Sequence, residues 1–439
     1  MAELDERDVS HGASRFKPAA QPHLRAPQEA RRSGFTKFLC VVAVLAVLVL
    51  AGFIFWRHRP VSIYVDGDPR TVFKRSTVED LFRDERPDVA PGNLVSVTGN
   101  VLGERQGNPF SAQVDGNEVS YEESLEYRLF GGENVSFADG DDRIEEYTTE
   151  VTRMAPRLEV VVRDGTPEKG YMVQQGTVQY VSDWGRPGTH EVHHGVLSGE
   201  TGDGTVIEEP RNTVVTVQNI HPDNDEKLVA LTFDDGPSYF TETYLDILAQ
   251  HGVKATFCIM GEQVADGAYV IGETAAAGHL IASNTWDHKQ LTTLEADEVQ
   301  REIGDTAAAL RDVIGTDVNF LRPPYGDLDS QAWLNSGGHV AVSVYWTHDS
   351  LDWEMPGVDA IVHNATEPMA PGSVILMHDG GGDRNQDVEA LPRIIEAWQA
   401  AGYRFVTMRE LLESDSSIDL SAVDMGSMPA DGMWPTELA

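Results

Sequence analysis

The sequence predicts an α/β fold over residues 226–415, in the form of a parallel (β/α) barrel. Seven apolar runs, from "LVALTFDDG" to "YRFVTMREL", have the composition of strands, and most are followed by a segment with helical spacing. Strands that alternate with helices in this way favour a parallel sheet. Two further observations concern the rest of the 439-residue chain: a long apolar run lies near the N-terminus, and β-like sequence fills the region between that run and the barrel.

The apolar run at residues 38–56 is predicted to be a transmembrane helix, with a buried core helix as the alternative. It contains no charge, and at about 1.5 Å per residue it can cross a hydrocarbon layer of about 30 Å. Residues 1–37 contain several Arg and Lys but show no periodicity, so we expect a disordered cytoplasmic tail. Arg57 and Arg59 favour the opposite orientation only weakly. The expected protein is single-pass in the cell membrane, with the rest of the chain outside the cell.

The composition excludes one class of partner. The formal net charge is −38, from 33 Lys and Arg against 71 Asp and Glu, which argues against nucleic-acid binding. The two cysteines, Cys40 in the apolar run and Cys258 in a predicted strand, are not expected to form a disulfide. The oligomeric state does not follow from the sequence.

Residues 60–225 are predicted to be a β-rich extracellular region of one or two modules. Near its start, "SIYVDG" and "RTVFKR" alternate like strands, and "STVEDLF" begins with a serine that can cap a helix. This part resembles the β-grasp, ubiquitin-like domain that is repeated in cell-wall resuscitation-promoting factors. His190, His193 and His194 are candidate metal ligands, although we favour a solvent-facing strand for them. The acidic segment 416–439 is predicted to be disordered.

Polar clusters follow the predicted strands of the barrel: "DDG", "NTWDH", "RPPYG", "HDSLDW" and "HD". The carboxyl ends of barrel strands share one rim, so we expect these clusters to form one site. Of the adjacent carboxylates Asp234 and Asp235, one can accept a proton while the other binds a cation. Asp235, His288 and the amide oxygen of Asn284 would give three ligands of a catalytic metal, provided that the "NTWDH" segment is helical. The alternatives are an Asp-Gly-Pro turn and a structural histidine.

The remaining clusters supply groups for acid–base chemistry. His378, at the end of "SVILMHD", can donate a proton to a leaving group, and Asp349 can orient that histidine. Arg322 can hold a carboxylate by a bidentate contact. Trp353 and Leu376 can form a small apolar pocket near the metal.

In this order and spacing, the five motifs resemble those of the polysaccharide deacetylase family, which is the NodB homology domain of carbohydrate esterase family 4. The resemblance covers about residues 226–412 and implies a distorted (β/α) barrel that removes N-acetyl groups with a divalent metal: zinc, or else cobalt, manganese or nickel. Position by position, it implies the following roles: Asp234 the catalytic base, Asp235 and His288 metal ligands, Arg322 and Asp349 residues that tune the base and the acid, the Tyr325 N–H an oxyanion donor, Trp353 and Leu376 the walls of the acetate pocket, and His378 the general acid.

One residue departs from the family pattern, because the second motif of the family begins with histidine where this sequence has Asn284. An amide oxygen is a weaker ligand for zinc than an imidazole nitrogen, so we expect weaker metal binding. The membrane anchor and the resemblance make peptidoglycan N-acetylglucosamine the expected substrate. Teichoic or capsular polysaccharides and N-acetylmuramic acid are the other substrates considered. The alternative function is a non-catalytic wall-binding protein with a degenerate site.

Overall fold

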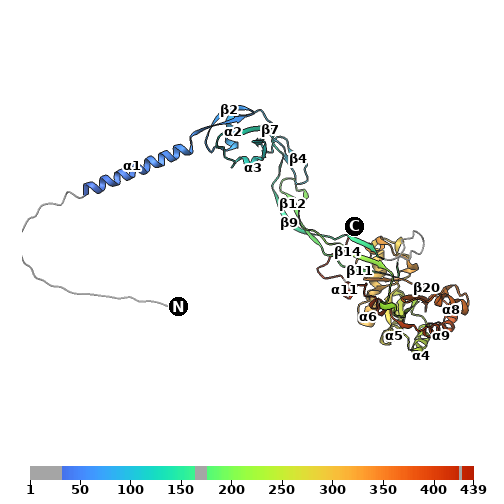
Figure 1. The fold of residues 1–439 in the computed structure, drawn as a ribbon. Helices are drawn as coiled ribbons and strands as arrows, with labels where there is room; N and C mark the ends of the chain where they lie inside the picture. Colours follow the sequence, from blue (N-terminus) through green and yellow to red (C-terminus); the bar gives the residue numbers. More distant parts are fainter. Residues whose placement is uncertain (1–31, 164–175, 425–427) are drawn as a thin grey trace, which may run out of the picture. The chain divides into compact units, whose positions relative to one another are not determined.

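The computed structural model describes residues 32–163, 176–424 and 428–439 (Figure 1). The chain divides into two compact units, Met1–Glu145 and Glu146–Ala439. Most of the predicted cytoplasmic tail, up to residue 31, lies outside the described residues. Cys40 is exposed and Cys258 is buried, and both are free thiols, as predicted.

The first helix of unit one, α1 (Arg32–Arg57), confirms the predicted N-terminal helix but begins before residue 38. Its segment Lys37–Arg57 has a mean hydropathy of 3.1 and no buried part, so it is long and apolar enough to cross a membrane. Its orientation in a membrane stays a prediction.

The rest of unit one is a small mixed α/β domain. Its five-stranded sheet has the order β2-β1-β7-β5-β6, with β1 (Pro60–Val65) and β2 (Asp68–Phe73) as the predicted hairpin. The other elements are β5 (Ser111–Val114), β6 (Asn117–Val119), β7 (Asn134–Ala138), α2 (Val78–Glu85), α3 (Tyr121–Ser124), and a three-stranded sheet of β3 (Leu94–Val95), β4 (Val101–Gly103) and β8 (Arg143–Ile144). Thr77, the residue after the predicted serine, caps α2. The β-grasp assignment stays a prediction.

The large sheet of unit two contains all of the strands predicted for the barrel. It has 11 strands in the order β10-β14-β11-β19-β18-β17-β16-β15-β21-β20, and β22 also pairs with β15. The strands of the predicted α/β part are β15 (Leu228–Gly236), β16 (Thr256–Ile259), β17 (Leu280–Ser283), β18 (Phe320–Leu321), β19 (Val342–Val344), β20 (His348–Asp349), β21 (Ser373–His378) and β22 (Arg404–Val406). Their mutual pairings are parallel. Within the described ranges no pairing joins β20 back to β19, so the parallel α/β fold is confirmed and a closed barrel is not.

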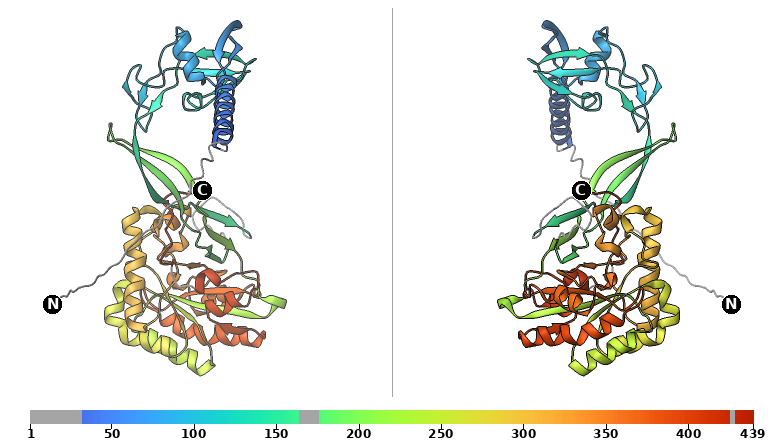
Figure 2. Two further views of the ribbon diagram at one scale, coloured as in Figure 1. Left: turned by 90° about the vertical axis from the view of Figure 1, so that its left-hand side faces the viewer. Right: turned by 90° about the vertical axis from the view of Figure 1, so that its right-hand side faces the viewer.

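Helices surround this sheet in both views of Figure 2. They are α4 (Thr241–His251), α5 (Val264–Ala276), α6 (Ala296–Ile314), α7 (Ser330–Asn335), α8 (Val358–Thr366), α9 (Asn385–Ala400), α10 (Met408–Glu413) and α11 (Ser421–Asp424). Buried apolar side chains of the strands, such as Phe233, Phe257 and Ile375, pack with Trp398 of α9 in one core. Burial of this surface stabilises the sheet and fixes the loops at its carboxyl edge.

The β-rich middle region is only partly a spacer. Three of its strands, β10 (Leu158–Val162), β11 (Val178–Asp183) and β14 (Thr213–Gln218), extend the large sheet, with β11 antiparallel to β19. The predicted boundary at residue 226 is therefore not the boundary of the compact unit. Another three strands, β9 (Tyr147–Met154), β12 (Gly188–Gly195) and β13 (Thr201–Glu208), form a separate antiparallel sheet.

The three candidate histidines of the middle region lie on β12 and are partly exposed. His194 Nε2 lies 3.2 Å from Glu150 Oε2, and the His193 ring stacks on Tyr147 with 4.1 Å between centroids. This is the strand environment that the sequence predicts.

The C-terminal segment is folded where it is described, so the prediction of disorder was wrong there. Trp184 Nε1 donates to the Ala422 carbonyl over 2.7 Å, and Trp434 Nε1 donates to Leu334 O over 2.7 Å. A backbone bridge joins Leu158 of β10 to Leu438. A few large apolar residues therefore hold this segment against the rest of the unit, although most of its residues are acidic or small.

Candidate active site

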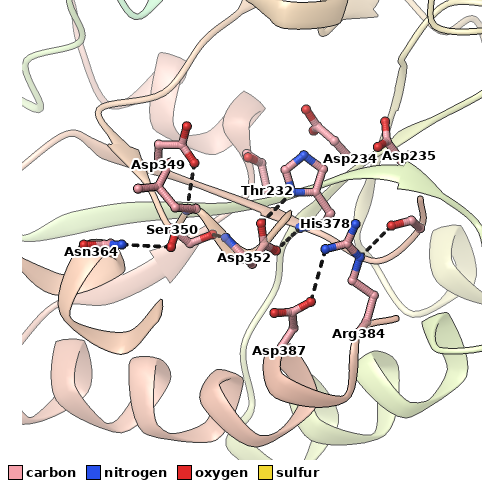
Figure 3. A network of polar contacts seen from close by, with 12 residues as sticks. Thr232, Asp234, Asp235, Asp349, Ser350, Asp352, Asn364, His378, Arg384 and Asp387 are labelled. Carbon is pink, nitrogen blue, oxygen red and sulfur yellow. Dashed lines mark hydrogen bonds and ion pairs between the residues drawn. The ribbon is translucent and has the colours of Figure 1, made fainter. Parts of the chain in front are cut away.

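The polar clusters meet in one cavity of about 810 Å³ at the carboxyl edge of the parallel strands. Its lining comprises Asp234, Asp235, His288, Gln290, Pro323, Tyr325, Asp327, Trp346, Trp353, Leu376 and His378. Asp234 of β15 and His378 of β21 are register partners on neighbouring strands, so their side chains lie next to each other (Figure 3). Arg322 and Asn284 are fully buried beneath this lining.

Asp234 is held by a buried arginine. Arg322 Nη1 donates to both carboxylate oxygens of Asp234, over 3.0 and 2.9 Å, and Nη2 donates to Thr232 Oγ1 over 3.1 Å. A single nitrogen, Nη1, thus contacts both carboxylate oxygens of Asp234. Burial opposes the charge of Arg322, but the Asp234 carboxylate outweighs it and raises the pKa of the guanidinium.

Asp235, Asn284 and His288 converge on one point. Asp235 Oδ1 lies 3.4 Å from Asn284 Nδ2 and 3.4 Å from His288 Nε2. Burial raises the pKa of Asp235, and the adjacent His288 only partly opposes this shift. The other atom of the amide, Asn284 Oδ1, is buried without a hydrogen-bond partner.

This arrangement fits a divalent metal ion. Rotation of the Asn284 amide would exchange its oxygen and nitrogen and turn the unpartnered Oδ1 toward Asp235 and His288. The donor set would then be a carboxylate oxygen, an amide oxygen and an imidazole nitrogen. No group of three or more His, Cys, Asp or Glu in the described part of the chain could hold a metal, and at this site the third donor would be the amide of Asn284.

The "NTWDH" segment is a turn, so the condition that it is helical is not met and the i, i+4 spacing does not explain how Asn284 and His288 meet. Thr285 and His288 have φ angles of 65° and 60°, which interrupt any helix. Glu302 of α6, which the sequence analysis missed, accepts from the N–H groups of Trp286 (2.8 Å) and Asp287 (3.2 Å). This buried carboxylate fixes the turn that brings Asn284 and His288 together.

Asp352, and not the predicted Asp349, contacts His378. Asp352 Oδ1 lies 2.7 Å from His378 Nδ1, and Oδ2 accepts from the backbone N–H of His378 over 2.7 Å (Figure 3). Burial opposes the charge of the imidazole, but the hydrogen bond and the charge of Asp352 outweigh it and raise the pKa of His378 to about 9. Asp349 Oδ1 instead accepts from Leu351 N over 2.9 Å.

The apolar wall of the cavity is formed by Trp353, Leu376 and Trp346. Trp353 is 52% exposed, whereas Leu376 is buried. Tyr325 lies at the cavity in the turn Pro324–Gly326, with φ at 61°, and its ring forms a T-shaped pair with the His288 ring at 4.8 Å between centroids. The structure thus brings every predicted site residue to this region, with Asp349 beside the cavity.

A buried arginine that sequence reasoning missed supports the loop after His378. Arg384 Nε donates to Gly380 O over 2.7 Å, and Nη1 lies 3.5 Å from Asp387 Oδ2 (Figure 3). A Cβ on Gly380 would lie 1.8 Å from Asp235 O, so only glycine lets the loop approach Asp235 this closely. The signal in the sequence is the triple glycine at 380–382.

Comparison with known proteins finds relatives of the part of the chain that carries this site. Residues 221–338 match the family model described as polysaccharide deacetylase. A peptidoglycan-N-acetylglucosamine deacetylase of Bacillus cereus is 34% identical over 43% of this chain and 90% of its own length. A chitooligosaccharide deacetylase of Rhizobium leguminosarum is 37% identical over 44% of this chain and 90% of its own length. The chain belongs to the polysaccharide deacetylase family.

Among solved structures, a family 4 acetyl xylan esterase from Clostridium thermocellum in complex with a cobalt ion is similar. It is 31% identical, with a TM-score of 0.41, over 44% of this chain and 96% of its own.

Proposed function

We propose that this chain is a membrane-anchored, metal-dependent deacetylase that hydrolyses the acetamide of peptidoglycan N-acetylglucosamine. The observation that carries this proposal is that two charged pairs lie side by side at one cavity: Asp234 with Arg322, and His378 with Asp352. Asp234 and His378 are register partners on the neighbouring strands β15 and β21. The family supports deacetylation of a polysaccharide. The apolar helix α1 and the named activity of the Bacillus relative support a substrate in the cell wall.

Each of the catalytic residues has a separate role in the proposed hydrolysis. Asp234 accepts a proton from the water that attacks the acetamide carbonyl, and Arg322 keeps the carboxylate in place. The Tyr325 N–H donates to the carbonyl oxygen as it becomes negative. His378, protonated at neutral pH, gives its proton to the sugar nitrogen as the C–N bond breaks. The products are acetate and a free amino sugar.

Asp235, His288 and Asn284 would hold the divalent ion, for which zinc is expected and cobalt, manganese or nickel can substitute. When bound, such an ion polarises the carbonyl and lowers the pKa of water. Trp353 and Leu376 would contact the acetyl methyl group and exclude bulk water from it. Arg384 and the glycine loop would keep Asp235 in its ligand position.

Acetate release tests this proposal. The full-length chain in detergent micelles is incubated with isolated peptidoglycan and with N-acetylglucosamine oligomers, each with zinc, cobalt, manganese or nickel. We expect acetate and an equal amount of free amine from both substrates. Acetate release from the oligomers but not from peptidoglycan would contradict the proposed substrate, and no release with any metal would contradict the enzymatic function.

The second candidate is a non-catalytic wall-binding protein, and the observation that favours it is Asn284 in place of histidine. Metal titration separates the two functions. A degenerate site is expected to stay empty at millimolar metal, whereas the proposed enzyme is expected to bind one ion.

The variant Asn284→His is expected to bind zinc more tightly by about tenfold, the scale on which residues around a metal site change affinity. The reason is that an imidazole nitrogen is a better zinc donor than an amide oxygen. Asn284→Ala, which removes the donor, is the matched control and is expected to weaken binding. Calorimetric titration of the wild type and the two variants with zinc measures the order of their affinities. Equal affinities would show that residue 284 does not contact the metal.

A further inference from the structure

Asp327 is a polar group of the cavity with no part in the proposed chemistry. It follows the turn Pro324–Gly326 and lines the cavity beside Gln290. Gln290 Nε2 donates to Asp327 Oδ2 over 2.6 Å, and Thr292 Oγ1 donates to the same oxygen. Two donors on one oxygen fix the carboxylate, and the described residues provide no donor for Oδ1, which remains free to accept a hydrogen bond.

The partners of Asp327 also differ from those of the other acidic residues in the lining. Asp234 is paired with Arg322, and Asp235 lies beside His288. Among the described residues, the Asp327 carboxylate receives hydrogen bonds only from neutral side chains, and those that line the cavity include no lysine or arginine. The cavity therefore offers a fixed anionic acceptor at Asp327, while its basic side chains, His288 and His378, lie beside Asp235 and Asp352.

We propose that Asp327 is a specificity-determining residue that accepts a hydrogen bond from a hydroxyl group of the acetamido sugar and discriminates against N-acetylmuramic acid. This inference rests on the proposed deacetylation. The hydroxyls of N-acetylglucosamine are neutral donors. N-acetylmuramic acid carries a lactyl ether, which contains a carboxylate, on the ring carbon adjacent to the one that bears the acetamide, and two carboxylates in one partly enclosed cavity repel each other.

The variant Asp327→Asn tests the inference in the full-length chain in detergent. It keeps the shape of the side chain but removes its charge. For N-acetylglucosamine oligomers we expect KM to rise about tenfold with kcat changed by less than about threefold, because the acceptor of the sugar hydroxyl loses its charge and the hydrogen bond is weaker. The ratio of kcat/KM for these oligomers to that for N-acetylmuramic-acid-containing saccharides is expected to fall about tenfold.

Two further variants make the test specific. Thr292→Val removes one of the two donors that fix Asp327 and is expected to raise KM by a smaller factor. Asp312→Asn makes the same charge change at an exposed position of α6 and is expected to alter neither KM nor the substrate ratio.

The outcomes separate this inference from the proposed function. Deacetylation by the wild type with KM and substrate ratio unchanged in Asp327→Asn would overturn the role of Asp327 and leave the activity standing. If the wild type releases no acetate from either sugar, the activity is wrong. Calorimetric binding of the two sugars to wild type and Asp327→Asn then tests Asp327 directly, and equal affinities of the two proteins for both sugars would overturn the inference.

Discussion

Asp234→Asn is expected to lower kcat by about 10²–10⁴-fold, the range that a positioned general base contributes. The amide keeps the shape of the carboxylate but cannot take a proton from water. KM is expected to change little, because the lost interaction is made in the transition state. The measurement is the rate of acetate release from N-acetylglucosamine oligomers at saturating metal.

The same variant leaves Arg322 fully buried without its anionic partner. Loss of one member of a buried ion pair costs about 3–5 kcal/mol of unfolding free energy. Rates are therefore compared at a temperature where circular dichroism shows the variant to be folded. A folded Asp234→Asn chain that keeps more than about a tenth of the wild-type kcat would contradict the role of Asp234 as the base.

Asp352→Asn is expected to shift the alkaline limb of the pH profile to lower pH and to reduce kcat/KM by about 10²-fold at pH 8. His378 must be protonated to act as the acid, and its pKa of about 9 keeps it protonated below that pH. Wild-type activity should thus fall as the pH rises through about 9. Without the Asp352 carboxylate, burial is left to oppose the charge, so the fall should come at a lower pH.

The protonation of His378 also affects the stability of the folded protein. Because the pKa of His378 is raised in the folded protein, its protonation stabilises the fold below the ordinary histidine pKa of about 6.5, and this contribution is lost as the pH rises through about 9. Asp349→Asn is the matched control, because among the described residues the Asp349 carboxylate accepts a hydrogen bond only from the Leu351 N–H. A larger shift of the pH profile in Asp349→Asn than in Asp352→Asn would contradict the assignment.

Local sequence patterns were sufficient to predict the strands of the α/β fold and most residues of the candidate site. Continuous apolar runs such as "LVALTFDD" mark strands that are buried on both faces, and parallel strands place their carboxyl ends at one edge. The two aspartates of "HDSLDW" could not be distinguished by spacing. Their roles depend on a turn in which Leu351 and Met355 have positive φ, and this turn brings Asp352 to His378.

Contacts between distant segments could not be predicted in the same way. The strands β10, β11 and β14 look like strands of an independent β module, and only their pairing with one another and with β19 assigns them to the large sheet. Gln290, Asp327 and Glu302 are polar residues without a motif. Their importance comes from the cavity and from the turns that they hold.

The most direct test of the central claim is acetate release from N-acetylglucosamine oligomers by the full-length chain, before and after removal of metal with a chelator. We predict that release falls to background when the metal is removed and returns when zinc, cobalt, manganese or nickel is added, with one ion bound per chain. The same treatment of Asp235→Asn should restore neither metal nor activity. Acetate release that continues unchanged from metal-free protein would contradict a metal-dependent deacetylase.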